Sequence, residues 1–320
     1  MAAPHAELSV SQAVANPSYT SSRPQERAAP HSRLWPALSA LAVAAAFLAL
    51  FHRWFLTQHR LSLASPDDWG HAWIVPFISS YAVWKRRDTL RRLRPEVYWP
   101  GALALTLGVL CYFYFATGLP NHMLQGWSIV LSLYSLVLLL LGPALTKVLT
   151  FPIAYLLFGV TISEMVMYDI TFALQLIASK GAWIALNIAG IPTDVAGNVL
   201  SITGRDGTAI PLEVAKACSG MRTVVAFYAL GTAVAYFSCP RWWQRTALLL
   251  LVGPIAVGVN ILRVASLGMA SRVNPALAQG EAHMFIGVLW LLPALGVFMA
   301  CVWALKRVAP RAQDEETAVS

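Results

Sequence analysis

Charged residues are scarce in this chain, and that scarcity bounds its class. Only 12% of the 320 residues are charged and 58% are hydrophobic, with a mean hydropathy of +0.60. Soluble domains carry about twice this charge density, and several apolar runs reach the ~20 residues that cross a bilayer. The composition therefore excludes an ordinary soluble domain and predicts an all-α, polytopic membrane helical bundle embedded in the lipid bilayer.

Acidic residues are outnumbered by basic ones, 15 to 23, which leaves a formal net charge of +8. The basic residues mark the ends of apolar runs and are not interleaved with aromatics, so we expect no nucleic-acid partner. Lys and Arg are in excess in cytoplasmic loops, so the positions of the basic residues indicate which loops are cytoplasmic.

Several cofactor and catalytic motifs are missing. The seven histidines are scattered, and neither HExxH nor CxxC occurs, so we expect no metal site. No Walker A or GxGxxG sequence opens a helix and there is no GxSxG, which disfavours a nucleotide-driven pump. We expect the protein to need no cofactor.

Basic clusters predict the orientation of the spans. Six cations lie within Lys85–Arg94, which places that loop in the cytoplasm. Basic residues also follow the spans that end near Ser238 and Leu305. The resulting topology has eight spans and two cytoplasmic termini. The predicted spans are Trp35–Phe55, Trp69–Trp84, Tyr98–Thr117, Trp127–Leu141, Leu149–Ile162, Cys218–Ser238, Thr246–Leu267 and His283–Leu305.

The remaining segments complete the domain organisation. Residues 1–33 are rich in Pro, Ser, Ala and Arg and are predicted to be a disordered cytoplasmic tail. Residues 34–308 form the transmembrane domain, and 309–320 a second cytoplasmic tail. Residues 163–216 are predicted to be an extracytoplasmic insertion within the domain.

The insertion contains one helix and one hairpin. Polar Thr171, Gln175 and Ser179 recur every four residues on the otherwise apolar Glu164–Gly190 segment. Such a stripe suits an interfacial or cavity-lining helix as well as a span, and the charge rule favours an interfacial or re-entrant helix. Two short runs, 199–203 and 208–213, lie on either side of a Gly-Arg-Asp-Gly turn, which predicts a small β-hairpin.

Cys218 lies where the chain enters its sixth predicted span. Lys216 and Arg222 flank it, and nearby cations favour the reactive thiolate. Many lone cysteines on membrane helices are inert packing residues, which is the alternative explanation. The predicted topology places the other three cysteines within spans or near the cytoplasmic side, leaving Cys218 as the one thiol at the outer face.

Helix arithmetic brings other polar residues to the depth of Cys218. A rise of 1.5 Å per residue brings the returning helix level with Cys218 near Asn260 and Arg263, and the last span begins with His283 on the same side. An ionisable residue inside a membrane segment is costly and is a candidate functional group. Each residue also has a simpler explanation. Arg263 could extend its charged group to the lipid headgroups, and His283 could be an ordinary residue at the start of a helix.

Together these groups suit acyl transfer at a peptide bond. Cys218 would attack the carbonyl and His283 would move the proton. Arg263 would stabilise the thiolate or the oxyanion, with Asn260 on the same helical face in support. Arg222 would be a more distant cation or a substrate contact. His71, at the outer start of the second span, is a competing histidine.

Three ordered motifs, Ala217–Arg222, Asn260–Arg263 and His283–Gly287, resemble those of the exosortase/archaeosortase family. The second predicted span, running from His71 into Lys85–Arg87, resembles that family's early histidine helix, although Ser-His-Gly is replaced by Gly-His-Ala. The resemblance extends over most of the chain, from about Asp67 to Leu305.

This resemblance implies a membrane-embedded cysteine protease or transpeptidase whose proposed catalytic Cys, Arg and His correspond to Cys218, Arg263 and His283. The implied partners are secreted proteins with a C-terminal sorting signal: a short Pro-Glu-Pro-like (PEP-CTERM) motif, an apolar helix and a basic tail. Cleavage would occur at the outer face of a bacterial cytoplasmic membrane, followed by transfer to an unknown acceptor nucleophile.

Two other classes remain open. A transporter would use intramembrane charges for coupling, but no convincing internal repeats or paired broken helices are seen in the sequence. A non-catalytic scaffold for exopolysaccharide export would require no chemistry at Cys218. Substitution of Cys218 separates both from an enzyme.

Overall fold

The computed structural model describes residues 31–214, 220–274 and 280–308, and the side chains at 31–37, 67, 222 and 280–284 lie outside this description. The chain divides into two compact units, of which the first ends at Leu50 and the second begins at Phe51. The described part of the first unit is helical and is the beginning of α1 (His31–Ala64). The architecture below belongs to the second unit, which also holds every candidate residue.

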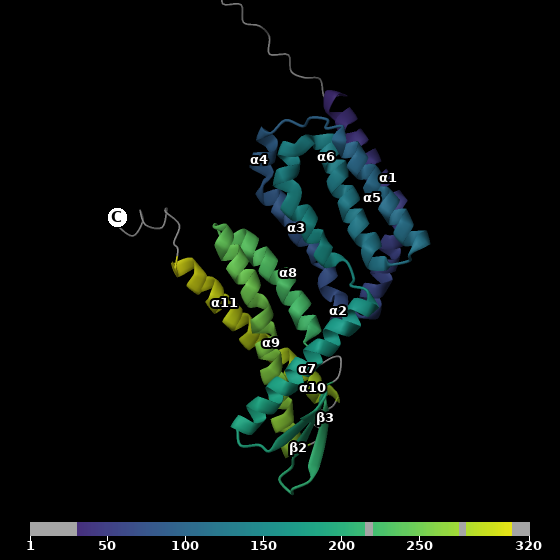
Figure 1. The fold of residues 1–320 in the computed structure, drawn as a ribbon. Coiled ribbons are helices and arrows are strands. Elements are labelled where there is room, and N and C mark those ends of the chain that lie inside the picture. Colours follow the sequence, from purple (N-terminus) through teal and green to yellow (C-terminus); the bar gives the residue numbers. More distant parts are fainter. Residues whose placement is uncertain (1–30, 215–219, 275–279, 309–320) are drawn as a thin grey trace, which may run out of the picture. The chain divides into compact units, whose positions relative to one another are not determined.

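The second unit begins within α1 and continues with the helices that precede the insertion in sequence (Figure 1). Their bounds are α2 (Pro66–Trp69), η1 (Gly70–Trp73), α3 (Val75–Lys85), α4 (Arg87–Arg92), α5 (Pro100–Phe113), η2 (Tyr114–Gly118), α6 (His122–Tyr155) and η3 (Leu156–Gly159). Helix α5 packs along α6, and α3 packs against α6 and η3. The Ser79 hydroxyl of α3 donates to the Pro152 carbonyl at 2.7 Å, so a buried polar contact fixes the α3–α6 interface.

Helix α6 is interrupted near its centre. Gly142 has φ 79° and ψ 172°, and Pro143 follows it. Proline has no N–H to donate, so Pro143 cannot bond to the carbonyl of Leu139 four residues earlier. The N–H of Tyr98, in the segment before α5, donates to that carbonyl instead, at 3.0 Å. The two limbs of α6 correspond to the predicted fourth and fifth spans.

The second half contains α7 (Glu164–Ile188), a small sheet and four further helices. Strands β1 (Thr193–Ala196), β2 (Val199–Thr203) and β3 (Ala209–Glu213) form an antiparallel sheet in the order β1-β2-β3. The helices that follow are α8 (Met221–Ser238), α9 (Trp242–Val273), α10 (Gly280–Leu289) and α11 (Leu291–Val308). Helix α9 contacts α7, α8, α10, α11 and the sheet, so it is the element around which this half packs.

The predicted hairpin is confirmed as β2 and β3, and β1 adds a strand that the sequence pattern did not predict. Leu200 and Ile202 of β2 are fully buried and belong to one core with Leu186 of α7 and Val264 of α9. Alternation on β2 buries one face of the strand against helices, which anchors the sheet to α7 and α9.

The polar stripe of α7 faces the protein interior. Thr171, Gln175 and Ser179 are all buried. The Ser179 hydroxyl lies 2.9 Å from the carbonyl oxygen of Gly197, in the turn between β1 and β2. Ser179 of the stripe therefore links the helix to the sheet, and the placement of α7 at the membrane interface stays a prediction.

The predicted number of eight spans is not reproduced. Among the described residues, five helical stretches are long and apolar enough to cross a membrane: Leu38–Ala64, Pro100–Gly118, His122–Gly159, Trp242–Val273 and Phe285–Val308. Thr223–Ser238 is apolar but shorter. The count treats both limbs of α6 as one helix. The predicted second span is divided into α2, η1 and α3, so no single long helix is counted there. Pro76 lies in the first turn of α3, where proline is tolerated but from which it cannot continue a preceding helix.

Candidate functional site

The start of α8 lies directly against Asn260 of α9. Gly220 precedes α8 with φ 83°, and a Cβ built on it would lie 2.7 Å from Asn260 Cγ. Asn260 is buried. A residue other than glycine would thus be strained by its backbone and obstructed by its neighbour. Cys218 is two residues before Gly220 and lies outside the described residues.

Arg263 lies one helical turn beyond Asn260 and packs on α10. A Cβ built on Gly287 would lie 2.7 Å from Arg263 Nη2 and 3.0 Å from Cζ. The guanidinium therefore occupies the space that the missing side chain leaves. Its Nε is buried, and no hydrogen-bond partner for it occurs among residues 31–214, 220–274 and 280–308. A buried charged donor without a partner is costly, so this group is suited to a partner beyond those residues.

These two contacts bring the three predicted motifs into one region. Gly220 belongs to the first motif, Asn260 and Arg263 to the second, and Gly287 to the third. Gly287 follows His283 by four residues, so both positions are on the same face of α10. The side chains of Cys218, Arg222 and His283 lie outside the description, and the geometry of the predicted Cys–Arg–His set stays a prediction.

His71 has a different environment, in the short turn η1 outside the five candidate spans. Burial lowers the pKa of His71, while backbone hydrogen bonds to Phe158 and Asp68 act in the opposite direction. Its Nε2 is buried and lacks a hydrogen-bond partner among the described groups. The contacts of His71 are thus with η3 and the preceding turn, and a neutral imidazole at pH 7 is the form this environment favours.

A cleft of about 780 Å³ reaches the first residue of α8; charged and polar side chains lie among its apolar lining, and we call it the polar cleft. Its lining includes Asp68, His122, Glu164 and Met221, of which Met221 is three residues after Cys218. The ring of His122 stacks on Trp54 with centroids 5.0 Å apart. Sequence patterns do not predict this cleft, because its lining comes from segments far apart in the chain.

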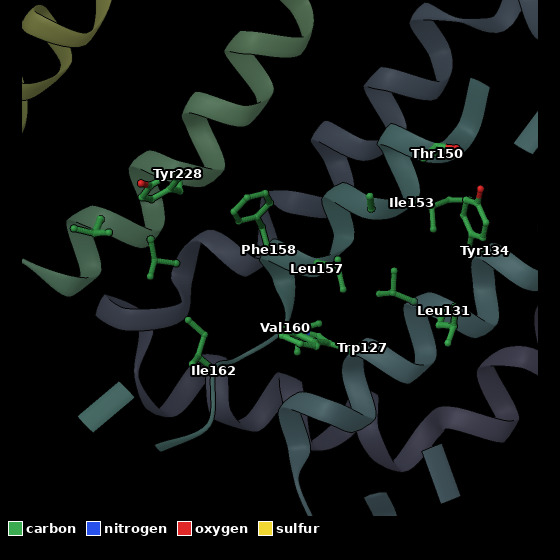
Figure 2. Close-up of a pocket in the computed structure, with 14 residues that line it drawn as sticks. Trp127, Leu131, Tyr134, Thr150, Ile153, Leu157, Phe158, Val160, Ile162 and Tyr228 are labelled. Carbon is green, nitrogen blue, oxygen red and sulfur yellow. The ribbon is translucent and has the colours of Figure 1, made fainter. Parts of the chain in front are cut away.

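An apolar pocket of about 650 Å³ adjoins the polar cleft and shares Ile162 with it. Figure 2 shows its aromatic lining, with Trp127 and Tyr134 on one limb of α6, Phe158 on η3 and Tyr228 on α8. Val224, Val225 and Tyr228 follow Met221 at helical spacing, so they continue the same face of α8. One face of α8 thus lines a polar space near its start and an apolar space further along.

Comparison with known proteins identifies the family. A family model described as a transmembrane exosortase matches residues 62–303, about three quarters of the chain. No curated protein matches the chain, and no solved structure does. The match covers all three motifs, η1 and every residue that lines the two pockets except Leu61, and the chain belongs to the transmembrane exosortase family.

Proposed function

We propose that this transmembrane exosortase is a cysteine transpeptidase or protease that cleaves C-terminal sorting signals of secreted proteins at the outer face of the bacterial cytoplasmic membrane. The observation that carries the proposal is the packing of Arg263 on Gly287, with the start of α8 on Asn260 beside it. Gly220 follows Cys218 by two residues and Gly287 follows His283 by four, so this packing supports a site to which all three motifs contribute.

The proposed reaction is acyl transfer through a thioester. The Cys218 thiolate forms a C–S bond to the scissile carbonyl carbon, the carbonyl π electrons move to oxygen, and Arg263 stabilises that oxyanion. When the carbonyl re-forms, the C–N bond breaks and His283 gives a proton to the leaving amine. Water or an amine then attacks the thioester, loses its proton to His283, and restores the Cys218 thiolate.

The two adjoining pockets support a bipartite substrate. A sorting signal has a short polar motif followed by an apolar helix. The polar cleft reaches Met221 near the start of α8, and the apolar pocket continues along Val224, Val225 and Tyr228. A substrate lying along this face of α8 would place its polar motif beside the segment that carries Cys218 and its apolar helix among aromatic side chains.

The proposal is tested by replacing the nucleophile. A secreted reporter with a Pro-Glu-Pro-like motif, an apolar helix and a basic tail is expressed with the wild-type chain, Cys218→Ala or Cys218→Ser, and its processing is followed by gel mobility. Both variants should abolish processing because neither supplies a thiolate. Cys301→Ala, a thiol of α11, is the matched control and should leave processing unchanged.

A trapped intermediate would identify the chemistry. A reporter–enzyme adduct that hydroxylamine releases should be recovered when wild-type processing is stopped by acid. It should decrease in His283→Ala, because His283 also protonates the leaving amine, and be absent from Cys218→Ala. Processing that continues at the wild-type rate in Cys218→Ala, with equal amounts of enzyme in the membrane, would sink the enzymatic function and favour a scaffold or transporter.

A further inference from the structure

A group of cations surrounds two adjacent aromatic rings at the end of α8. The guanidinium carbons of Arg86 and Arg245 lie 5.6 Å and 5.8 Å from the centre of the Tyr236 ring. The Lys85 ammonium lies 5.1 Å from the centre of the Phe237 ring. Lys85 is the last residue of α3 and Arg86 follows it, whereas Arg245 belongs to α9. Three charges of one sign thus converge from two parts of the sequence that are more than 150 positions apart.

Hydrogen bonds and stacking hold this group in place. The Tyr236 ring stacks on Phe151 with an interplanar angle of 2°. The Arg86 Nε donates to the Tyr236 hydroxyl at 3.2 Å, and the Arg245 Nε donates to the Cys239 carbonyl at 2.9 Å. Each guanidinium is therefore oriented through its Nε, and within the described part of the chain no hydrogen bond uses its terminal amino groups.

The group has no described counter-ion. Within residues 31–214, 220–274 and 280–308, the only ion pair joins Arg87 to Asp88 at 3.8 Å. Lys306 adds to the positive field: burial raises the pKa of the Cys239 thiol, whereas Lys306 and Arg245 act to lower it. Like charges gathered around one pair of adjacent rings repel one another unless solvent or an anion compensates them.

The chemistry of the site selects its ligand. Arginine binds phosphate through two parallel N–H donors, and the positive end of the α9 dipole lies at the helix start that carries Arg245. Tyr and Trp are typical of the headgroup level of a bilayer, and an anionic leaflet attracts basic residues at that level. A phosphate group satisfies the charge, the donor geometry and the location together.

We propose that Arg86 and Arg245, assisted by Lys85, form a binding site for a phosphate group, supplied by an anionic phospholipid headgroup or by free phosphate. The bound phosphate links the end of α3 to the α8–α9 turn and stabilises their contact. This inference does not depend on the proposed enzymatic function.

The site is tested by ligand-dependent stability of the full chain. The purified protein is reconstituted in nanodiscs of phosphatidylcholine alone or with phosphatidylglycerol, and Tm is measured for each; a third arm adds inorganic phosphate to the phosphatidylcholine sample. Wild type should gain several degrees with phosphatidylglycerol, the shift expected when the ligand is about 100-fold above its Kd. A gain with inorganic phosphate alone would also support the site and would identify free phosphate as a sufficient source.

The variants decide whether these residues form the site. Arg86→Gln should lose at least half of the gain, and Arg245→Lys, which keeps the charge but loses the guanidinium fork, should lose part of it. Arg92→Gln removes an exposed charge of α4 that no described contact uses, and it should retain the full gain. Each gain is a difference within one variant, so a change in basal stability cancels. Equal gains in wild type, Arg86→Gln and Arg245→Lys, or no gain in wild type from either phosphate source, would overturn the proposal.

Discussion

Two arginines of α9 occupy contrasting environments. They are eighteen positions apart, which at 1.5 Å per residue is about 27 Å, close to the thickness of a bilayer core. Arg245 donates to the Cys239 carbonyl and lies over Tyr236. Arg263 has a buried Nε without a partner among the described groups, and its guanidinium fills the space above Gly287.

The contrast shows two uses of a cation on one membrane helix. Arg245 has the hydrogen bond and aromatic contact expected of a residue at an interface. Arg263 is positioned by packing and keeps donor capacity in a buried place, where hydrogen bonding and charge act strongly. The difference favours Arg263, not Arg245, as the residue that stabilises developing negative charge.

The largest expected effect separates the two arginines directly. Arg263→Gln should lower the rate of reporter processing by about 10²–10³, the usual loss when an oxyanion donor is removed. Arg245→Gln should lower it less than about tenfold because the residue lies at the other end of α9. Rates are measured at equal membrane abundance. Similar losses in both variants would remove the distinction.

A smaller effect is expected from filling the space beneath Arg263. In Gly287→Ala the new Cβ would lie 2.7 Å from Nη2, so the flexible guanidinium must move while the helices stay in place. Processing should fall by about tenfold or more, since a displacement of about 1 Å is costly for catalysis, with little change in Tm. Gly296→Ala on α11 meets no atom within 4 Å and is the control. An unchanged rate in Gly287→Ala would show that the position of Arg263 is unimportant.

The smallest effect concerns the stability of the start of α8. Gly220 and Gly207 have nearly the same φ, 83° and 84°, and a left-handed conformation costs a non-glycine residue about 1–2 kcal/mol. Gly207→Ala meets open space, whereas Gly220→Ala also meets Asn260. Tm should therefore fall in both variants and further in Gly220→Ala. Equal decreases would mean that Asn260 yields freely, and the close approach of α8 to α9 would then carry little energy.

The sequence patterns that succeeded are local ones. Two short runs on either side of Gly204–Gly207 predicted the hairpin, because turn residues between strand-like segments act over a short stretch of chain. Strand β1 was missed because its four residues carry little pattern of their own, and it is completed by pairing with β2. The predicted number of eight spans is not confirmed, and one place where the two differ is the second span, where hydropathy is continuous but a new helix begins at Val75–Pro76.

The candidate site shows the same division. The motifs containing Cys218, Arg263 and His283 were recognisable from residue type and order, and family membership supports that interpretation. The polar cleft was not predictable, because Asp68, Glu164 and Met221 come together only through the packing of separate helices. The period of the polar stripe of α7 was visible in the sequence, but only the structure shows that the stripe is buried and that Ser179 meets the turn at Gly197.

By itself, the sequence determined the membrane class, the apolar segments, the hairpin and the three motifs, since hydropathy, charge and turn chemistry act over short stretches of chain. Only the tertiary structure decided that Gly220 meets Asn260, that Arg263 meets Gly287, and that Arg86 and Arg245 share Tyr236. These contacts join residues that are far apart in sequence, and close packing of helices, not local propensity, sets which of them meet.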